Sequence, residues 1–308
     1  MLLEESLIAK DDAQQHLIEY YRAFELLLSR QRERNELRTH FGFLDEVSLT
    51  NDYCFFKAIS APDQFPEMTS IATYSSNVLH EKLFHHKNWS PSKVLDVGFG
   101  SGGTMTRLGL EWMNSDIHGI NLNPVQYDIA RRKLSHQDNL QFFLGDYLDY
   151  PFVDRYDLVY FIESAFHILD KERLVKRIAD SLNQGGEAYI VDIFYSDIIK
   201  RLFGRKKKVN EEIFDYISVD DWKALAEKNG LEMISFEDYS QEAANHICIR
   251  TSEDEFEELL MNPLLEGITE DKDLMAERIW EAYHGYAKLH KFFKRGLLYY
   301  GIIRFIKR

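Results

Sequence analysis

The chain has 308 residues, enough for one substantial core with an appended cap, and its 45% apolar content is typical of a globular protein. A formal net charge of −14 argues against sequence-independent binding to nucleic acid, because the phosphates would be repelled. The sequence contains no apolar run long enough for a membrane span and no signal peptide pattern. We therefore expect a cytoplasmic protein, and homo-oligomerisation stays open.

Residues 1–90 are predicted to form an N-terminal helical or cap segment. Within residues 2–37, apolar side chains recur at helical spacing, namely Leu17, Tyr21, Phe24 and Leu28. Two prolines, Pro62 and Pro66, are expected to interrupt any long element before a helix over 75–86.

Strands and helices alternate over residues 91–195. Strands are predicted at 94–97, 117–120, 140–144, 156–162 and 188–194, with helices at 104–112, 124–135 and 171–182. Asn183–Gly186 is expected to cap the last of these helices. This alternation predicts a parallel sheet covered by helices.

Residues 196–217 are predicted to be a basic loop or lid, because they contain Arg205–Lys208. This run either holds a substrate phosphate or carboxylate, or is a solvated loop. Residues 218–308 should complete the sheet, with strands at 231–236 and 298–306 and a helical cap insertion at 252–293. The cysteines and histidines show no metal-ligand spacing, so no metal is predicted.

The most informative stretch is Val94–Gly103, which reads Val-Leu-Asp-Val-Gly-Phe-Gly-Ser-Gly-Gly. It predicts a strand, a tight glycine-rich turn and a helix start. Glycine lets a ligand lie against the main chain, and the free N–H groups of a helix start suit a polar ligand group. The spacing differs from the dinucleotide pattern G-x-G-x-x-G, and an ordinary turn between strand and helix is the alternative.

Together with four further segments, this stretch resembles the class I S-adenosylmethionine-dependent methyltransferases. The segments are Ile117–Gln126, Leu144–Asp146, Tyr156–His167 and Leu182–Gly186. The resemblance implies an α/β fold: a Rossmann-like, doubly wound, seven-stranded, mostly parallel sheet with helices on both faces. Residues 91–195 would then form the core that binds S-adenosylmethionine. The segments Ile117–Gln126 and Tyr156–His167 look most like a subgroup that methylates sterols, tocopherols, prenyl compounds and polyketides.

The resemblance implies a set of cofactor-binding residues. These are Asp96 on the methionyl side, Gly98, Gly100 and Gly102 along the backbone, Asn121 at the ribose, Gln126 at the ribose or the methionyl end, Asp146 and Tyr147 at the adenine, and Glu163. Asn121 stands where many relatives have an acid, so its bond to the ribose would be weaker. Asp96 and Asp146 could instead cap turns, and Gln126 could be a surface helix residue.

Glu163 and His167 follow the fourth strand and are the predicted catalytic residues. His167 is the natural base for a hydroxyl acceptor, and Glu163 could take the proton from a carbon acceptor. Alternatively, Glu163 only holds the cofactor and His167 is structural. We therefore expect methyl transfer from S-adenosylmethionine to the O or C of a small lipophilic metabolite. An RNA or protein methyltransferase and a non-catalytic cofactor-binding protein are the alternatives.

Overall fold

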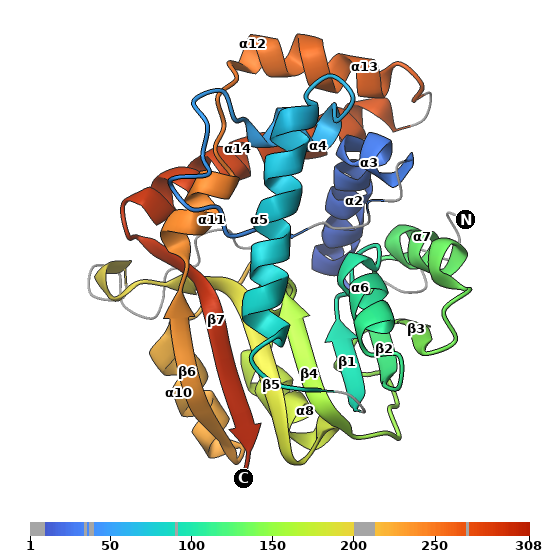
Figure 1. Cartoon of the computed structure of the whole chain (residues 1–308), viewed down its shortest axis with the longest axis vertical. Coiled ribbons are helices and arrows are strands. Elements are labelled where there is room, and N and C mark those ends of the chain that lie inside the picture. Colours follow the sequence, from blue (N-terminus) through green and yellow to red (C-terminus); the bar gives the residue numbers. More distant parts are fainter. Residues whose placement is uncertain (1–9, 34–35, 37–39, 90–91, 200–212, 269–270) are drawn as a thin grey trace.

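Seven strands form one sheet in the order β3-β2-β1-β4-β5-β7-β6 in the computed structural model of the chain (Figure 1). The structure describes residues 10–33, 36, 40–89, 92–199, 213–268 and 271–308. The strands are β1 (Lys93–Val97), β2 (Asp116–Asn121), β3 (Leu140–Leu144), β4 (Tyr156–Ile162), β5 (Leu182–Tyr195), β6 (Leu231–Asp238) and β7 (Leu298–Lys307). All neighbours pair in parallel except β7, which runs antiparallel to β5 and β6. The predicted mostly parallel, seven-stranded sheet is confirmed.

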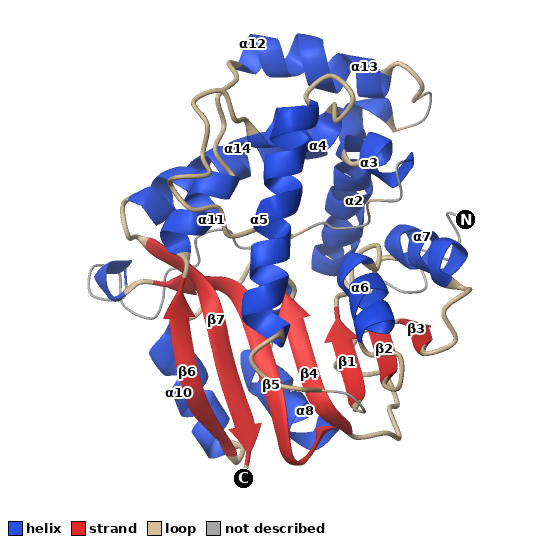
Figure 2. Ribbon diagram, viewed as in Figure 1, coloured by secondary structure: helices blue, strands red, loops and turns tan. Residues whose placement is uncertain are grey.

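Helices cover both faces of the sheet and also stand above its carboxyl edge (Figure 2). Those beside the sheet are α5 (Pro66–Phe84), α6 (Gly103–Glu111), α7 (Pro124–Leu134), α8 (Lys171–Ser181) and α10 (Val219–Lys228). Those above its carboxyl edge, here called the cap, are α2 (Asp12–Leu27), α3 (Ser29–Glu33), α4 (Phe55–Ser60), α12 (Glu253–Phe256), a π-helical turn (Glu257–Met261), α13 (Asn262–Leu265) and α14 (Lys272–Lys294). The helix α11 (Ser240–His246) joins the sheet to the cap.

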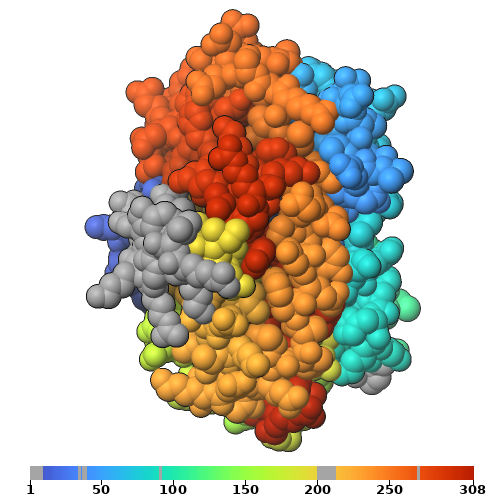
Figure 3. Space-filling view, turned by 90° about the vertical axis from the view of Figure 1, so that its left-hand side faces the viewer, coloured from blue at the N-terminus to red at the C-terminus, as the bar shows by residue number. Residues whose placement is uncertain are grey.

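The cap brings together segments from both ends of the chain. Helix α14 packs on α2, so C-terminal and N-terminal residues share one layer. In the space-filling view of Figure 3, C-terminal segments in orange and red extend from the cap down to the sheet edge. None of the described helices combines the length and the apolarity that crossing a bilayer requires.

Alternate strand residues face two hydrophobic cores, one on each side of the sheet. Val94 and Leu158 lie in the core that continues into the cap, whereas Leu95 and Val159 lie in the core under α8 and α10. Successive side chains of a strand point to opposite faces, and both faces here are covered. The sequences of these strands are therefore mostly continuous apolar runs rather than alternating ones.

Local side-chain caps explain where several helices begin. The side chain of Asn123 accepts hydrogen bonds from the backbone N–H groups of Val125 and Gln126, and Pro124 occupies the first turn of α7. Asp170 and Ser218 cap α8 and α10 in the same way. The helices α7 and α8 begin at the predicted residues, 124 and 171.

Two local predictions were wrong. Pro66 was expected to interrupt helix, but it begins α5, because a proline at the first helical turn loses no hydrogen bond. Gly185 and Gly186 were expected to cap α8, but α8 ends at Ser181 and both glycines belong to β5. Gly185 has a positive φ of 76°, which fits the irregular start of that strand.

Candidate functional site

The glycine-rich turn between β1 and α6 approaches a cavity at the carboxyl edge of the sheet. Gly98, Gly100 and Gly102 all have positive φ, at 80°, 56° and 89°. Gly98 and Gly100 line the cavity. Gly102 instead lies against α7, where an added Cβ would stand 2.7 Å from the side chain of Leu134. Two of the three predicted glycines thus face the site, and the third packs the turn against α7.

We expect Gly98→Ala to destabilise the fold more than Gly230→Ala. Both glycines have positive φ, so alanine should cost about 1–2 kcal/mol of strain at either position. At Gly98 the new Cβ would also lie 2.4 Å from Cβ of Ser164, whereas nothing stands within 4 Å at Gly230. Overpacking adds about 1–3 kcal/mol. Urea unfolding of the two variants measures this difference, and equal losses would contradict it.

The cavity has a volume of about 350 Å³ and lies where β1, β2 and β4 end. Cavities that bind small organic molecules span roughly 300–1,000 Å³. Helix α2 covers it with the side chains of Gln14, Leu17 and Tyr21. Most of the predicted site residues line its wall, namely Gly98, Gly100, Asn121, Gln126, Asp146, Tyr147, Glu163 and His167.

Asn121 and Gln126 belong to a hydrogen-bonded chain that ends on α2. Asn121 Nδ2 donates to the carbonyl of Gly100 (3.1 Å) and to Gln126 Oε1 (3.0 Å). Gln126 Nε2 donates to Oε1 of the buried Glu25 (3.0 Å), which also pairs with Arg32. Gln126 is therefore buried rather than a surface residue. This row of hydrogen bonds holds the glycine-rich turn in place relative to α2.

The two carboxyl oxygens of Asp146 have different partners, one in a local turn and one near the start of α2. Its Oδ1 accepts from the backbone N–H of Leu148 (2.9 Å), which is the capping contact considered above. Its Oδ2 faces the cavity, where it accepts from Lys10 Nζ (2.8 Å) and Gln14 Nε2 (3.2 Å). The neighbouring Tyr147 also lines the cavity, but its ring lies in the core under α8 and its hydroxyl contacts Ser181 Oγ (3.1 Å).

Asp96, a further predicted cofactor residue, lies in β1 just before the glycine-rich turn. It is buried in β1, where its Oδ2 accepts from the hydroxyl of Tyr160 (2.7 Å). Burial raises the pKa of Asp96 to about 7, although the Tyr160 hydrogen bond opposes the rise. Its side chain is not part of the wall formed by the described residues. Any influence on a ligand would pass through the turn.

Glu163 follows β4 directly and has an unusual backbone, with a φ of 53°. Its Oε1 accepts from the backbone N–H of Phe41 (2.6 Å) and from the hydroxyl of Tyr300 (2.6 Å). Among the described residues nothing donates to Oε2. Burial raises the pKa of Glu163 to about 8, outweighing those two hydrogen bonds. A non-glycine residue held at positive φ costs about 1–3 kcal/mol, and such strain is concentrated at functional sites.

His167 is a neutral imidazole with both ring nitrogens engaged. Nδ1 lies 2.7 Å from the carbonyl oxygen of Ile213 and must donate, since a carbonyl only accepts. Nε2 then accepts from the hydroxyl of Tyr21 (2.9 Å). Burial lowers the pKa of His167 to about 3. The pair His167–Tyr21 can therefore receive a proton through the tyrosine hydroxyl.

A second cavity of about 80 Å³ adjoins the first and is largely aromatic. Tyr21 and Glu163 line both cavities. The other aromatic side chains of the second cavity are Tyr20, Phe41, Phe166, Phe214, Tyr216, Tyr286 and Phe292. Phe41 and Phe292 each stand beside another phenylalanine in the sequence, Phe43 and Phe293, and such aromatic pairs are compatible with an apolar cap. Nothing in the sequence singles out Tyr286 or Tyr300.

The run Arg205–Lys208 lies outside the described residues, so its proposed contact with a substrate anion stays a prediction.

Comparison with known proteins matches the part of the chain that contains the glycine-rich turn and the strands around the larger cavity. Residues 94–186 match the model of a family described as a methyltransferase domain. Tocopherol O-methyltransferase of Arabidopsis thaliana is 30% identical over 167 residues, which are 49% of this chain and 47% of that protein. The chain spans about half the length of the curated relatives that it matches first.

Solved structures share the fold over most of the chain. The O-methyltransferase from the trans-AT PKS multienzyme of Brevibacillus brevis, in complex with S-adenosyl-L-homocysteine, has a TM-score of 0.69 at 20% identity and covers 88% of this chain and 84% of its own. Geranyl diphosphate C-methyltransferase from Streptomyces coelicolor has a TM-score of 0.65 at 16% identity and covers 97% and 100%.

Proposed function

We propose that this chain, whose residues 94–186 match a methyltransferase domain, is a class I S-adenosylmethionine-dependent enzyme that methylates an oxygen or carbon atom of a small lipophilic metabolite. The observation that supports this most is the shared wall of the two cavities, which is formed by Tyr21 and Glu163. A methyl donor in the larger cavity and an acceptor in the smaller one would meet at these two side chains.

The larger cavity fits S-adenosylmethionine in size and in the chemistry of its walls. Backbone at Gly98 and Gly100 would lie against the amino-acid and ribose parts, Asn121 would bond a ribose hydroxyl, and Asp146 would accept from the adenine amine. When bound, this cofactor supplies a methyl group made electrophilic by its sulfonium. The protein's contribution is alignment of the acceptor and exclusion of water, which can supply up to roughly 7–11 kcal/mol.

The smaller cavity favours an apolar acceptor. Tyrosine and phenylalanine rings form most of its wall, and Glu163 is the acidic group at the junction. A hydroxyl acceptor would pass its proton to Tyr21 and His167, whereas a carbon acceptor would pass it to Oε2 of Glu163. The apolar walls suit one part of a terpenoid, prenyl or polyketide-like acceptor, since about 80 Å³ is smaller than a whole molecule of this kind. Relatives named for tocopherol and geranyl diphosphate support this class. The cytoplasmic location and homo-oligomerisation stay predictions.

Incubation with methyl-labelled S-adenosylmethionine and a metabolite extract tests this function. We expect label in a small, organic-extractable product from the wild type and none from Gly98→Ala, whose turn is distorted. Label in RNA or protein would support the alternative class of methyltransferase. Tight binding of S-adenosylhomocysteine without turnover on any extract would support a non-catalytic protein.

We expect Asp146→Ala to weaken the binding of S-adenosylhomocysteine by roughly 10–100-fold, because a hydrogen bond to a charged group contributes about 1.5–3 kcal/mol. The control is Asp149→Ala, since Asp149 also lines the cavity and also pairs with Lys10. Calorimetry compares the two variants. Equal losses would mean that the pairing with Lys10, rather than an adenine contact, sets the affinity.

A further inference from the structure

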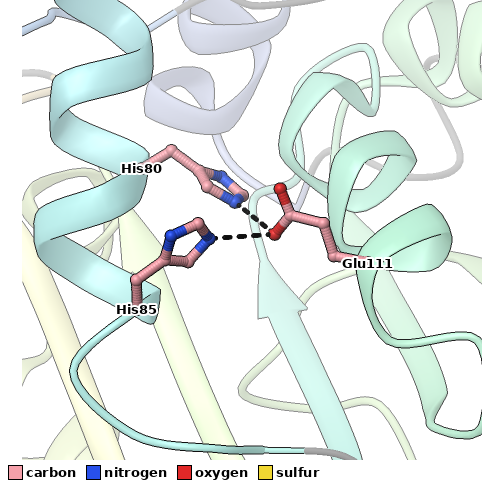
Figure 4. A group of neighbouring side chains, drawn as sticks. All are labelled: His80, His85 and Glu111. Atoms are coloured by element: carbon pink, nitrogen blue, oxygen red, sulfur yellow. Dashed lines mark hydrogen bonds and ion pairs between the residues drawn. The ribbon is translucent and has the colours of Figure 1, made fainter.

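A cluster of two histidines and a glutamate lies away from both cavities, where α5 meets α6 (Figure 4). His80 belongs to α5, His85 is its C-terminal cap residue, and Glu111 is the last residue of α6. Nε2 of His80 lies 3.0 Å from Glu111 Oε2, and Nε2 of His85 lies 3.2 Å from the same oxygen. In the described part of the chain, these donor atoms all lie within 4.8 Å of one another.

The spacing of the three donor atoms suits a small transition-metal ion. A tetrahedral ion with bonds of about 2.0–2.1 Å separates its ligand atoms by about 3.3 Å. The two nitrogen–oxygen distances need only a few tenths of an ångström of expansion to reach this value. Imidazole and carboxylate are also ligands that zinc accepts, whereas magnesium and calcium prefer all-oxygen sites.

The three side chains are partly open to solvent, and Glu111 is held in an orientation that suits metal binding. The side chain of His80 is 5% exposed, while His85 and Glu111 are 46% and 29% exposed, so an ion and a water molecule can enter from one side. Arg107 Nε donates to Glu111 Oε1 (2.6 Å), which turns Oε2 toward both imidazoles. A ligating carboxylate is commonly oriented by such an outer hydrogen bond.

The protonation states agree with this geometry. Burial lowers the pKa of His80 to about 4, although its hydrogen bond to Glu111 opposes the shift. Hydrogen bonds from Arg107 and His80 overcome the effect of burial on Glu111 and lower its pKa to about 2. A metal site needs neutral imidazoles and an ionised carboxylate.

We propose that His80, His85 and Glu111 bind a zinc-type divalent ion, with water in the remaining position, and that the ion ties α5 to α6. On binding, each imidazole moves its proton from Nε2 to Nδ1, so that Nε2 offers its lone pair to the ion. Since α6 begins at the glycine-rich turn, the ion would stabilise the helix that carries one side of the cofactor cavity. Histidines five residues apart with a glutamate from another helix form no recognisable sequence motif.

Calorimetric titration of the full chain, free of any affinity tag, with Zn²⁺ tests the site. We expect one ion per chain for the wild type, no comparable binding of Mg²⁺, and a Tm that rises with Zn²⁺ concentration. His85→Ala and Glu111→Gln should each weaken Zn²⁺ binding by more than roughly 100-fold, beyond the 10–100-fold typical of losing an outer partner. His136→Ala, which removes an exposed histidine elsewhere, should bind like the wild type.

Zn²⁺ affinity that is the same in the wild type and in the double variant His85→Ala/Glu111→Gln would overturn the proposal. Circular dichroism checks that each variant is folded, and Co²⁺ provides a readout on the unmodified protein. A four-coordinate Co²⁺ site gives strong visible absorption bands that Zn²⁺ then abolishes. Absence of these bands in the wild type would equally overturn it.

Discussion

Glu163→Gln is expected to lower kcat by roughly 10²–10⁴-fold while leaving the affinity for S-adenosylhomocysteine almost unchanged, if the acceptor is a carbon atom. Glutamine keeps the shape and can still accept from Tyr300 and the Phe41 backbone, so the walls of both cavities persist. It cannot take a proton from the acceptor. Single-turnover rates and calorimetry, measured on the same preparation, separate the two effects.

The matched control is Glu281→Gln, because Glu281 is another carboxylate in the wall of the second cavity. It forms ion pairs with His16 and Arg278 and is not placed at the junction of the cavities. A similar loss of kcat in both variants would mean that negative charge near the acceptor, rather than proton removal at Glu163, supports the reaction.

The pH dependence of this reaction should follow Glu163. Its pKa is about 8 in the folded chain, so the carboxylate that acts as a base is a minor form at pH 7. In the wild type kcat should therefore rise with pH and level off above about pH 8, and Glu163→Gln should lack this rise. A flat wild-type profile between pH 6 and 9 would exclude Glu163 as the base.

Stability should change with pH in the opposite direction. The folded chain keeps a proton on Glu163 between its ordinary pKa of 4.5 and about 8, whereas the unfolded chain has lost it. The stabilisation from this group is thus fully present below pH 4.5 and is lost as pH rises toward 8. Glutamine resembles the protonated form of Glu163, so the wild type should lose stability relative to Glu163→Gln over this range, as measured by urea unfolding.

His167→Ala is expected to lower kcat by roughly 100-fold or more if the acceptor is a hydroxyl. Tyr21→Phe should have a similar effect, because the Tyr21 hydroxyl lies between the second cavity and His167 Nε2. The double variant should then lose little more than either single variant, since the two side chains act as one unit. Steady-state kinetics on all three variants checks this.

The pH profile distinguishes this route from the one through Glu163. The pKa of His167 is about 3, so the ring stays neutral throughout the usual assay range and adds no rise of its own. A small effect of His167→Ala together with a large effect of Glu163→Gln would indicate a carbon acceptor. Additive losses in the double variant would contradict a Tyr21–His167 unit.

Several features of the fold could be predicted because their causes are local in the sequence. The apolar run before Gly98 and the glycines after it specify a strand, a turn and a helix start. Asn123 with Pro124, and likewise Asp170 and Ser218, satisfy the first N–H groups of the following helix within three residues. Pro66 was misread for a related reason, since a proline signals either the end or the beginning of a helix and only the packing of α5 selects one.

The sequence by itself determined the order of strands and helices, the glycine-rich turn and the residues that follow each strand, because these depend on neighbours a few positions away. Only the tertiary structure decided that Tyr300 and Phe41 hold Glu163, that Tyr21 meets His167, and that Glu111 faces His80. These partners are 31 to 146 residues apart in the chain. Such contacts form because burial of apolar helix faces brings the cap onto the sheet and α5 beside α6, and no local pattern encodes which polar groups then meet.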